Sequence, residues 1–152
     1  MTIQKDIEIR IIEDWGSDSC PMLLFRRLLK ELRPGATRYL PPHYLANLVK
    51  DHYGVKQVED AARYLSGPRI GLFELAFELI EEDNESRDIE TAMVLEALRT
   101  GILIDPETGE RIIDFETKVF MYFRGTDLLE KLVEHARQAE RVPRQAMSLQ
   151  GV

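Results

Sequence analysis

The chain has 152 residues, of which 44% are hydrophobic and 31% charged, and its formal net charge is −7. This composition is typical of a soluble globular protein with one hydrophobic core. Its single cysteine excludes a disulfide framework, and no apolar run approaches the ~20 residues that span a bilayer. We therefore expect one domain over residues 1–142, a disordered tail over 143–152, a cytoplasmic location and no membrane contact.

The negative charge is concentrated in the second half of the chain. Residues 1–80 contain 11 Lys and Arg and 11 Asp and Glu, whereas residues 81–152 contain 9 and 16. Non-specific binding to nucleic acid depends on the neutralisation of phosphates by basic side chains. The charge balance therefore argues against nucleic acid as a partner.

The first segment, residues 2–15, fits two patterns. Its isoleucines alternate with charged residues as in a strand, yet Ile7, Ile11 and Trp15 recur every four residues, as in a helix. Ion pairs four residues apart also support a helix, which we favour. Further helices are predicted at about 20–33, 42–53 and 56–66.

Residues 69–83 are predicted to form the most hydrophobic helix and the central element of the core. The polar residues of this segment fall on one helical stripe. The next helix is predicted over 86–99, after a cap formed by residues 83–86. The expected fold is mainly α: a compact bundle of six or seven helices around the 69–83 helix, with one β-hairpin or a small sheet.

The hairpin is predicted over about 102–114 from its turn residues. Pro106 presets the backbone for a type I turn, and Gly109 can adopt the left-handed conformation that closes a four-residue loop. Asp105 can accept hydrogen bonds from the turn amides. An isolated hairpin is marginally stable, so this one must pack on helices or on a partner.

The hairpin register follows from the turn. Ile104 is expected to pair with Arg111, and Ile102 with Ile113. Both resulting faces are apolar, so each needs cover, from the core on one side and from neighbouring aromatics or a partner chain on the other. The faces contain Ile102, Ile104, Ile113 and Phe115 on one side and Leu103 and Ile112 on the other.

Two elements are predicted after the hairpin. Residues 115–124 can form a short helix or a third strand, because they are rich in aromatic and β-branched side chains. An amphipathic helix capped by Thr126 and Asp127 then extends to about residue 140.

A winged-helix reading is one functional alternative. Helices at 56–66, 69–83 and 86–99, followed by a hairpin, have the order of a winged-helix core. The helix in the recognition position offers Asp88, Glu90 and Glu96, which repel phosphate. This composition weakens the case for a transcription regulator.

Surface stripes suggest a protein partner instead. A basic stripe lies opposite the leucine face of the second helix, an acidic stripe follows the 69–83 helix, and aromatic side chains stand beside the hairpin. A solvated helix face is the ordinary explanation of such stripes. The candidate partner-binding residues are Arg26, Lys30, Arg33, Glu74, Glu78, Phe120 and Phe123.

Cys20 is the candidate for thiol chemistry, because a helix N-terminus can lower a thiol pKa. Residues 13–21 resemble in part, through Trp15 and Cys20, the tryptophan-and-cysteine turn of thioredoxin-like proteins, which would imply a redox role. The chain lacks the second cysteine of those families.

No catalytic constellation, phosphate-binding loop or metal-ligand spacing stands out. The three histidines lie on separate segments without a cysteine nearby, so we expect no metal and no cofactor. By elimination, the sequence favours a non-enzymatic interaction protein, such as an adaptor, regulator or assembly factor. A homodimer, a winged-helix regulator and a small thiol enzyme remain alternatives.

Overall fold

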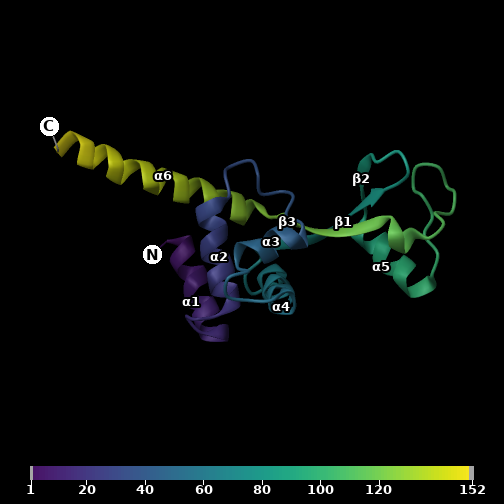
Figure 1. Ribbon diagram of the computed structural model, residues 1–152, viewed down its shortest axis with the longest axis horizontal. Helices are drawn as coiled ribbons and strands as arrows, with labels where there is room; N and C mark the ends of the chain where they lie inside the picture. The colour runs from purple at the N-terminus through teal and green to yellow at the C-terminus, as the bar shows by residue number, and fades with distance from the viewer. Residues whose placement is uncertain (1, 151–152) are drawn as a thin grey trace. The chain divides into compact units, whose positions relative to one another are not determined.

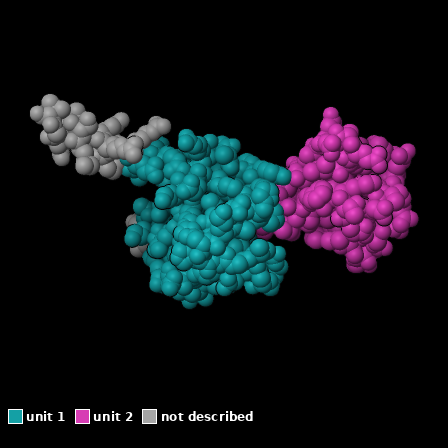
Figure 2. Space-filling model, viewed as in Figure 1, with its two compact units in different colours: residues 1–74, 124–152 teal, residues 75–123 magenta. Residues whose placement is uncertain are grey.

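The computed structural model describes the backbone of residues 2–150 and the side chains of residues 2–140. The chain forms two compact units (Figure 2). Unit 1 comprises residues 1–74 and 124–152, and unit 2 comprises residues 75–123. The expectation of a single domain over 1–142 stays a prediction, because compactness alone does not establish whether either unit folds by itself.

Unit 1 is helical and is built around its second helix (Figure 1). Helix α2 packs against α1, α3, α4 and α6. Leu24, Phe25 and Leu28 of α2 are completely buried. The unit 1 helices are α1 (Ile3–Trp15), α2 (Cys20–Glu31), α3 (Pro42–Leu48), α4 (Val55–Ser66) and α6 (Asp127–Gln150).

Three of the helices predicted in unit 1 are confirmed. Helix α1 is confirmed as a helix, and the Thr2 side chain caps it by accepting a hydrogen bond from the Lys5 amide at 3.2 Å. The predicted α2 and α4 are also confirmed. Helix α3 ends at Leu48, earlier than expected.

The last helix continues further than the sequence indicated. The backbone of α6 is helical to Gln150, beyond the expected end near residue 140. The prediction of a disordered tail over 143–152 is not tested, because the side chains of 141–150 and all of residues 151–152 lie outside the described part of the chain.

The prediction of a central helix over 69–83 is wrong. This segment contains strand β1 (Phe73–Ile80) instead. Its sequence satisfies two periods at once: Phe73, Phe77 and other apolar residues alternate with Glu74 and Glu78, and the two glutamates are also one helical turn apart. Pairing with two other strands decides the outcome, because tertiary context overrides the helix propensity of Leu, Ala and Glu.

The predicted helix over 86–99 is wrong in its first turn. Strand β2 (Ser86–Ile89) forms there, and α5 (Thr91–Thr100) follows. Strand β2 pairs antiparallel with β1, with Phe77 opposite Ile89 and Ile80 opposite Ser86. Residues expected to cap a helix therefore form the connecting turn, in which Asn84 adopts a left-handed conformation with φ 61°.

The open choice over 115–124 is resolved in favour of a strand. A short 3-10 turn (Phe115–Thr117) leads into β3 (Val119–Gly125). The strand order in the sheet is β2-β1-β3. With six α-helices in the part that the structure describes, which hold 51% of the 152 residues, the fold is a mixed α and β structure and not a bundle around a 69–83 helix.

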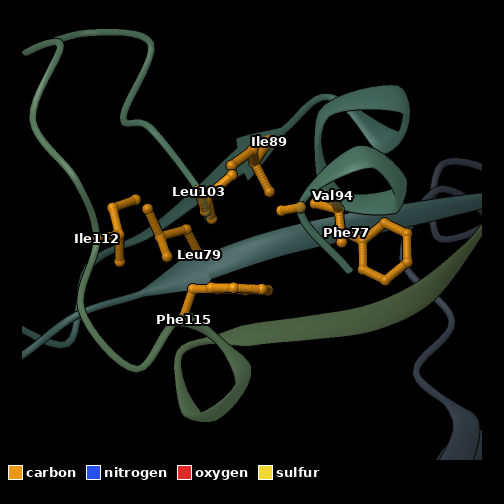
Figure 3. Close-up of a cluster of buried hydrophobic side chains, with 8 residues drawn as sticks. Phe77, Leu79, Ile89, Val94, Leu103, Ile112 and Phe115 are labelled. Carbon is orange, nitrogen blue, oxygen red and sulfur yellow. The ribbon is translucent and has the colours of Figure 1, made fainter. Parts of the chain in front are cut away.

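Unit 2 has its own hydrophobic cluster (Figure 3). Phe77 and Leu79 of β1 pack with Val94 of α5. Ala97 of the same helix is also buried there. The loop after α5 completes the cluster on its other side. The remaining members are Ile89, Leu103, Ile112 and Phe115, with Val119 partly buried against them.

Of the two predicted hairpin pairs, the pairing of Ile104 with Arg111 is confirmed, and the hairpin is reduced to this one bridge. Ile104 and Arg111 form an antiparallel bridge, and the Ile112 amide donates to the Leu103 carbonyl at 2.9 Å. Gly109 is left-handed, with φ 75°. Of the two apolar faces, the one with Leu103 and Ile112 is buried.

This orientation gives a direct test of the unit 2 core. We expect Ile112→Ala to lower the free energy of unfolding by about 2–5 kcal/mol, because it leaves a cavity in the cluster. The neighbouring Ile113→Ala is the matched control and should change it by about 0.5 kcal/mol or less, since Ile113 is exposed. Urea denaturation, monitored through hydrogen exchange of the β1 and β3 amides, measures the free energy of unfolding of both variants. Equal effects of the two substitutions would contradict the assigned orientation.

Candidate interaction surface

Two residues of the predicted basic stripe lie on the exposed side of α2, and the third, Arg33, follows the end of that helix. Arg26, Lys30 and Arg33 are all exposed. Arg26 is 3.9 Å from the Glu8 carboxylate of α1, a separation at which an exposed ion pair contributes little. Arg27 pairs with Asp51 and donates to the Leu48 carbonyl at 2.7 Å, which ties α2 to the end of α3.

The predicted acidic stripe does not exist as a helix edge, because its segment is a strand. Glu74 is exposed, whereas Glu78 is buried and accepts a hydrogen bond from the Ser86 hydroxyl at 2.8 Å. Strand alternation places Glu74 and Glu78 on one face of the sheet. Of these two candidate residues, Glu74 therefore remains at the surface and Glu78 does not.

The aromatic pair of β3 is divided between solvent and interior. Phe120 is exposed and Phe123 is buried. Residues three apart in a strand point to opposite faces. The two side chains therefore cannot form one joint surface, and only Phe120 is available to a partner.

Cys20 begins α2 but is buried. Burial raises the pKa of its thiol from 9.0 to about 11. The expected effect of the helix N-terminus is therefore outweighed by desolvation. A thiolate nucleophile at neutral pH has no support in this environment.

The winged-helix arrangement loses its middle helix, since residues 73–80 are a strand. Its proposed recognition helix also begins as strand β2. Among the residues that the structure describes, no group of three or more His, Cys, Asp or Glu side chains is placed to hold a metal ion. Within the same residues, no helix combines the length and apolarity needed to cross a bilayer.

An ion pair fixes the loop that follows α5. Arg87 of β2 donates to the two Asp105 carboxylate oxygens at 3.1 and 2.5 Å, a bidentate geometry. The Glu107 amide also donates to Asp105, at 2.9 Å, as the turn chemistry predicted. These interactions hold the pKa of Asp105 at about 2, with the Arg87 hydrogen bond as the largest cause.

Ile102, Ile104 and Ile113 form the outward side of this loop, and we call them the isoleucine face. They are 46%, 44% and 60% exposed. The Ile104–Arg111 bridge places them on the side opposite the buried Leu103 and Ile112. The sequence predicted that these three residues share a face, but not that solvent covers it. The prediction that Phe115 belongs to the same face is wrong, because Phe115 is buried in the unit 2 cluster.

Other apolar side chains of unit 2 are also exposed. Helix α5 buries only Val94 and Ala97 and leaves Leu95 and Leu98 in solvent. Sequence reasoning missed these two residues because the helix is apolar nearly all round, so its pattern does not distinguish the buried side. The remaining exposed members are Leu75, Phe120 and Met121.

The comparisons with known proteins add no relative. No family model, no curated protein and no solved structure matches the chain. A function can therefore be inferred only from the geometry and chemistry of the described residues.

The Asp105 pair predicts a defined pH dependence. Because its folded pKa of about 2 lies below the ordinary 3.8, ionised Asp105 stabilises the fold above about pH 4, and this is lost as the pH falls toward 2. Asp105→Asn should therefore be less stable than the wild type at pH 7, and the difference should shrink at acid pH. Urea midpoints of both proteins at several pH values measure this difference. A difference that is constant from neutral to acid pH would contradict the ion-pair role.

Proposed function

We propose that the chain is a non-enzymatic protein-interaction module and that unit 2 carries its partner-binding surface. The observation that supports this is the distribution of exposed large hydrophobic side chains. Eight of them belong to unit 2, which has 49 residues, and six belong to the larger unit 1. Exposed apolar side chains that gather in one region mark interaction sites, whereas scattered ones are ordinary.

The exposed hydrophobic side chains of unit 1 give weaker support for a partner-binding surface. Three isoleucines and Trp15 lie along α1, but the Trp15 ring packs against the Tyr64 ring in a tilted arrangement, with centroids 5.6 Å apart. Exposed Tyr39 and Val55 lie on other segments. In unit 2, by contrast, three isoleucines occupy one side of a single short loop.

The polar clusters of the chain support a structural role over a catalytic one. Asp14 accepts hydrogen bonds from Tyr64 and, at 2.8 Å, from Arg69, which ties α1 to the end of α4. Glu130 of α6 accepts from the Thr37 hydroxyl at 2.8 Å. In each cluster the carboxylate is paired with a group that joins two parts of the fold, as structural ion pairs are.

Site-specific photocrosslinking in the native cell tests this proposal. A photoreactive amino acid at position 113 or 104 should yield a discrete crosslinked product with one protein, because these positions lie on the isoleucine face. Mass spectrometry then identifies that protein.

Matched positions in unit 1 serve as controls. Val55, at 66% exposed, matches Ile113, and Ile12, at 44% exposed, matches Ile104. No such product should form from these positions. The absence of a product from positions 104 and 113, or the same products from all four positions, would contradict the proposal.

A further inference from the structure

We infer that the isoleucine face binds a basic, amphipathic segment of a partner protein. This inference rests on the proposed function and adds the chemistry of the partner. It combines two observations on unit 2, the outward isoleucines and the charge of the residues around them.

The charge of unit 2 differs sharply from that of unit 1. Unit 2 contains 13 Asp and Glu and 4 Lys and Arg, a formal net charge of −9, whereas unit 1 has 14 and 16, a net charge of +2. The net negative charge of the chain therefore belongs to unit 2, which also has the larger number of exposed hydrophobic side chains. An acidic field attracts and orients a basic partner and repels an acidic one.

The acidic groups lie close to the isoleucine face along the chain. Glu110, Asp114 and Glu116 are within three residues of Ile113 and all are exposed. Arg111 is opposite Ile104 in the bridge, so its side chain lies on the isoleucine face, and it is the one basic residue within residues 101–117, which contain five Asp and Glu. A segment that presents both apolar and cationic side chains would thus meet apolar surface and carboxylates together.

Other occupants of this face are disfavoured by the same charge. A second copy would bring two units of net charge −9 together around the isoleucines. Nucleic acid and anionic membranes carry dense negative charge, which these carboxylates repel. A basic protein segment is the occupant that gains from both the apolar and the acidic groups.

Binding of designed peptides to the purified full chain tests the inference. The probe is a short fluorescein-labelled amphipathic peptide of leucine and lysine, followed by fluorescence anisotropy. The comparison peptide replaces every lysine with glutamate. The lysine peptide should bind and should weaken between about 50 and about 300 mM NaCl, because salt screens exposed charges. The glutamate peptide should not bind.

Neutral substitutions separate the apolar contribution from the charge. Ile104→Ser with Ile113→Ser should raise the Kd of the lysine peptide about tenfold or more at unchanged net charge. The matched pair Ile12→Ser with Val55→Ser should change it by about twofold or less. Circular dichroism of each variant verifies that it is folded.

A second matched set tests the carboxylates. Glu110→Gln with Glu116→Gln should raise the Kd about threefold and reduce its salt dependence. Glu59→Gln with Glu134→Gln changes the net charge equally in unit 1 and should have a smaller effect, since these exposed residues lie in the other unit.

Four results would overturn the inference. Equal binding of the lysine and glutamate peptides would exclude basic chemistry, and equal loss in both serine pairs would exclude the isoleucine face. A dimer that dissociates on Ile104→Ser with Ile113→Ser, measured by analytical ultracentrifugation, would assign the face to a second copy.

If crosslinks map to this face but the lysine peptide does not bind, the partner chemistry is wrong and the interaction function stands. If both fail, both proposals fall.

Discussion

The ion pair between Arg87 and Asp105 is the interaction on which the architecture of unit 2 depends. The loop after α5 has one β-bridge, and the backbone hydrogen bonds of Asp105, Gly109 and Ile112 lie within the loop itself, so its attachment to the rest of unit 2 depends on side chains. Asp105 organises the turn through the Glu107 amide and ties it to strand β2 through Arg87. With the loop held in this way, Leu103 and Ile112 are buried in the core and the isoleucine face is outward.

Unit 2 combines exposed hydrophobic side chains with a high negative charge, and each feature limits the other. Its buried cluster has eight members, about as many as the large hydrophobics that it leaves in solvent. Exposed apolar surface promotes self-association, whereas a net charge far from zero opposes it. The carboxylates thus oppose self-association through the apolar surface, and under the proposed function they would also favour a basic partner.

Local patterns predicted some elements correctly and left others undecided. The caps and spacing of α1, α2 and α4 depend on nearby residues, and the Ile104–Arg111 register follows from a turn closed by Gly109. Residues 73–80 satisfy both helix and strand periods, and only their pairing with β2 and β3 decides between them. Prediction of the candidate site from the sequence was limited in the same way. The shared face of the three isoleucines was predictable, but its exposure depends on where α5 and the sheet lie. Because residues 73–80 were assigned to a helix, the burial of Glu78 on strand β1 was not predicted.

The most direct test of the central claim is methyl NMR of the full chain, labelled at isoleucine, with the crosslinked partner added. The exposed isoleucines form two groups, Ile3, Ile9 and Ile12 on α1 and Ile102, Ile104 and Ile113 on unit 2. If the isoleucine face is the binding surface, the second group should shift or broaden while the first stays unchanged. Changes confined to the α1 group, or none in either group, would contradict this account.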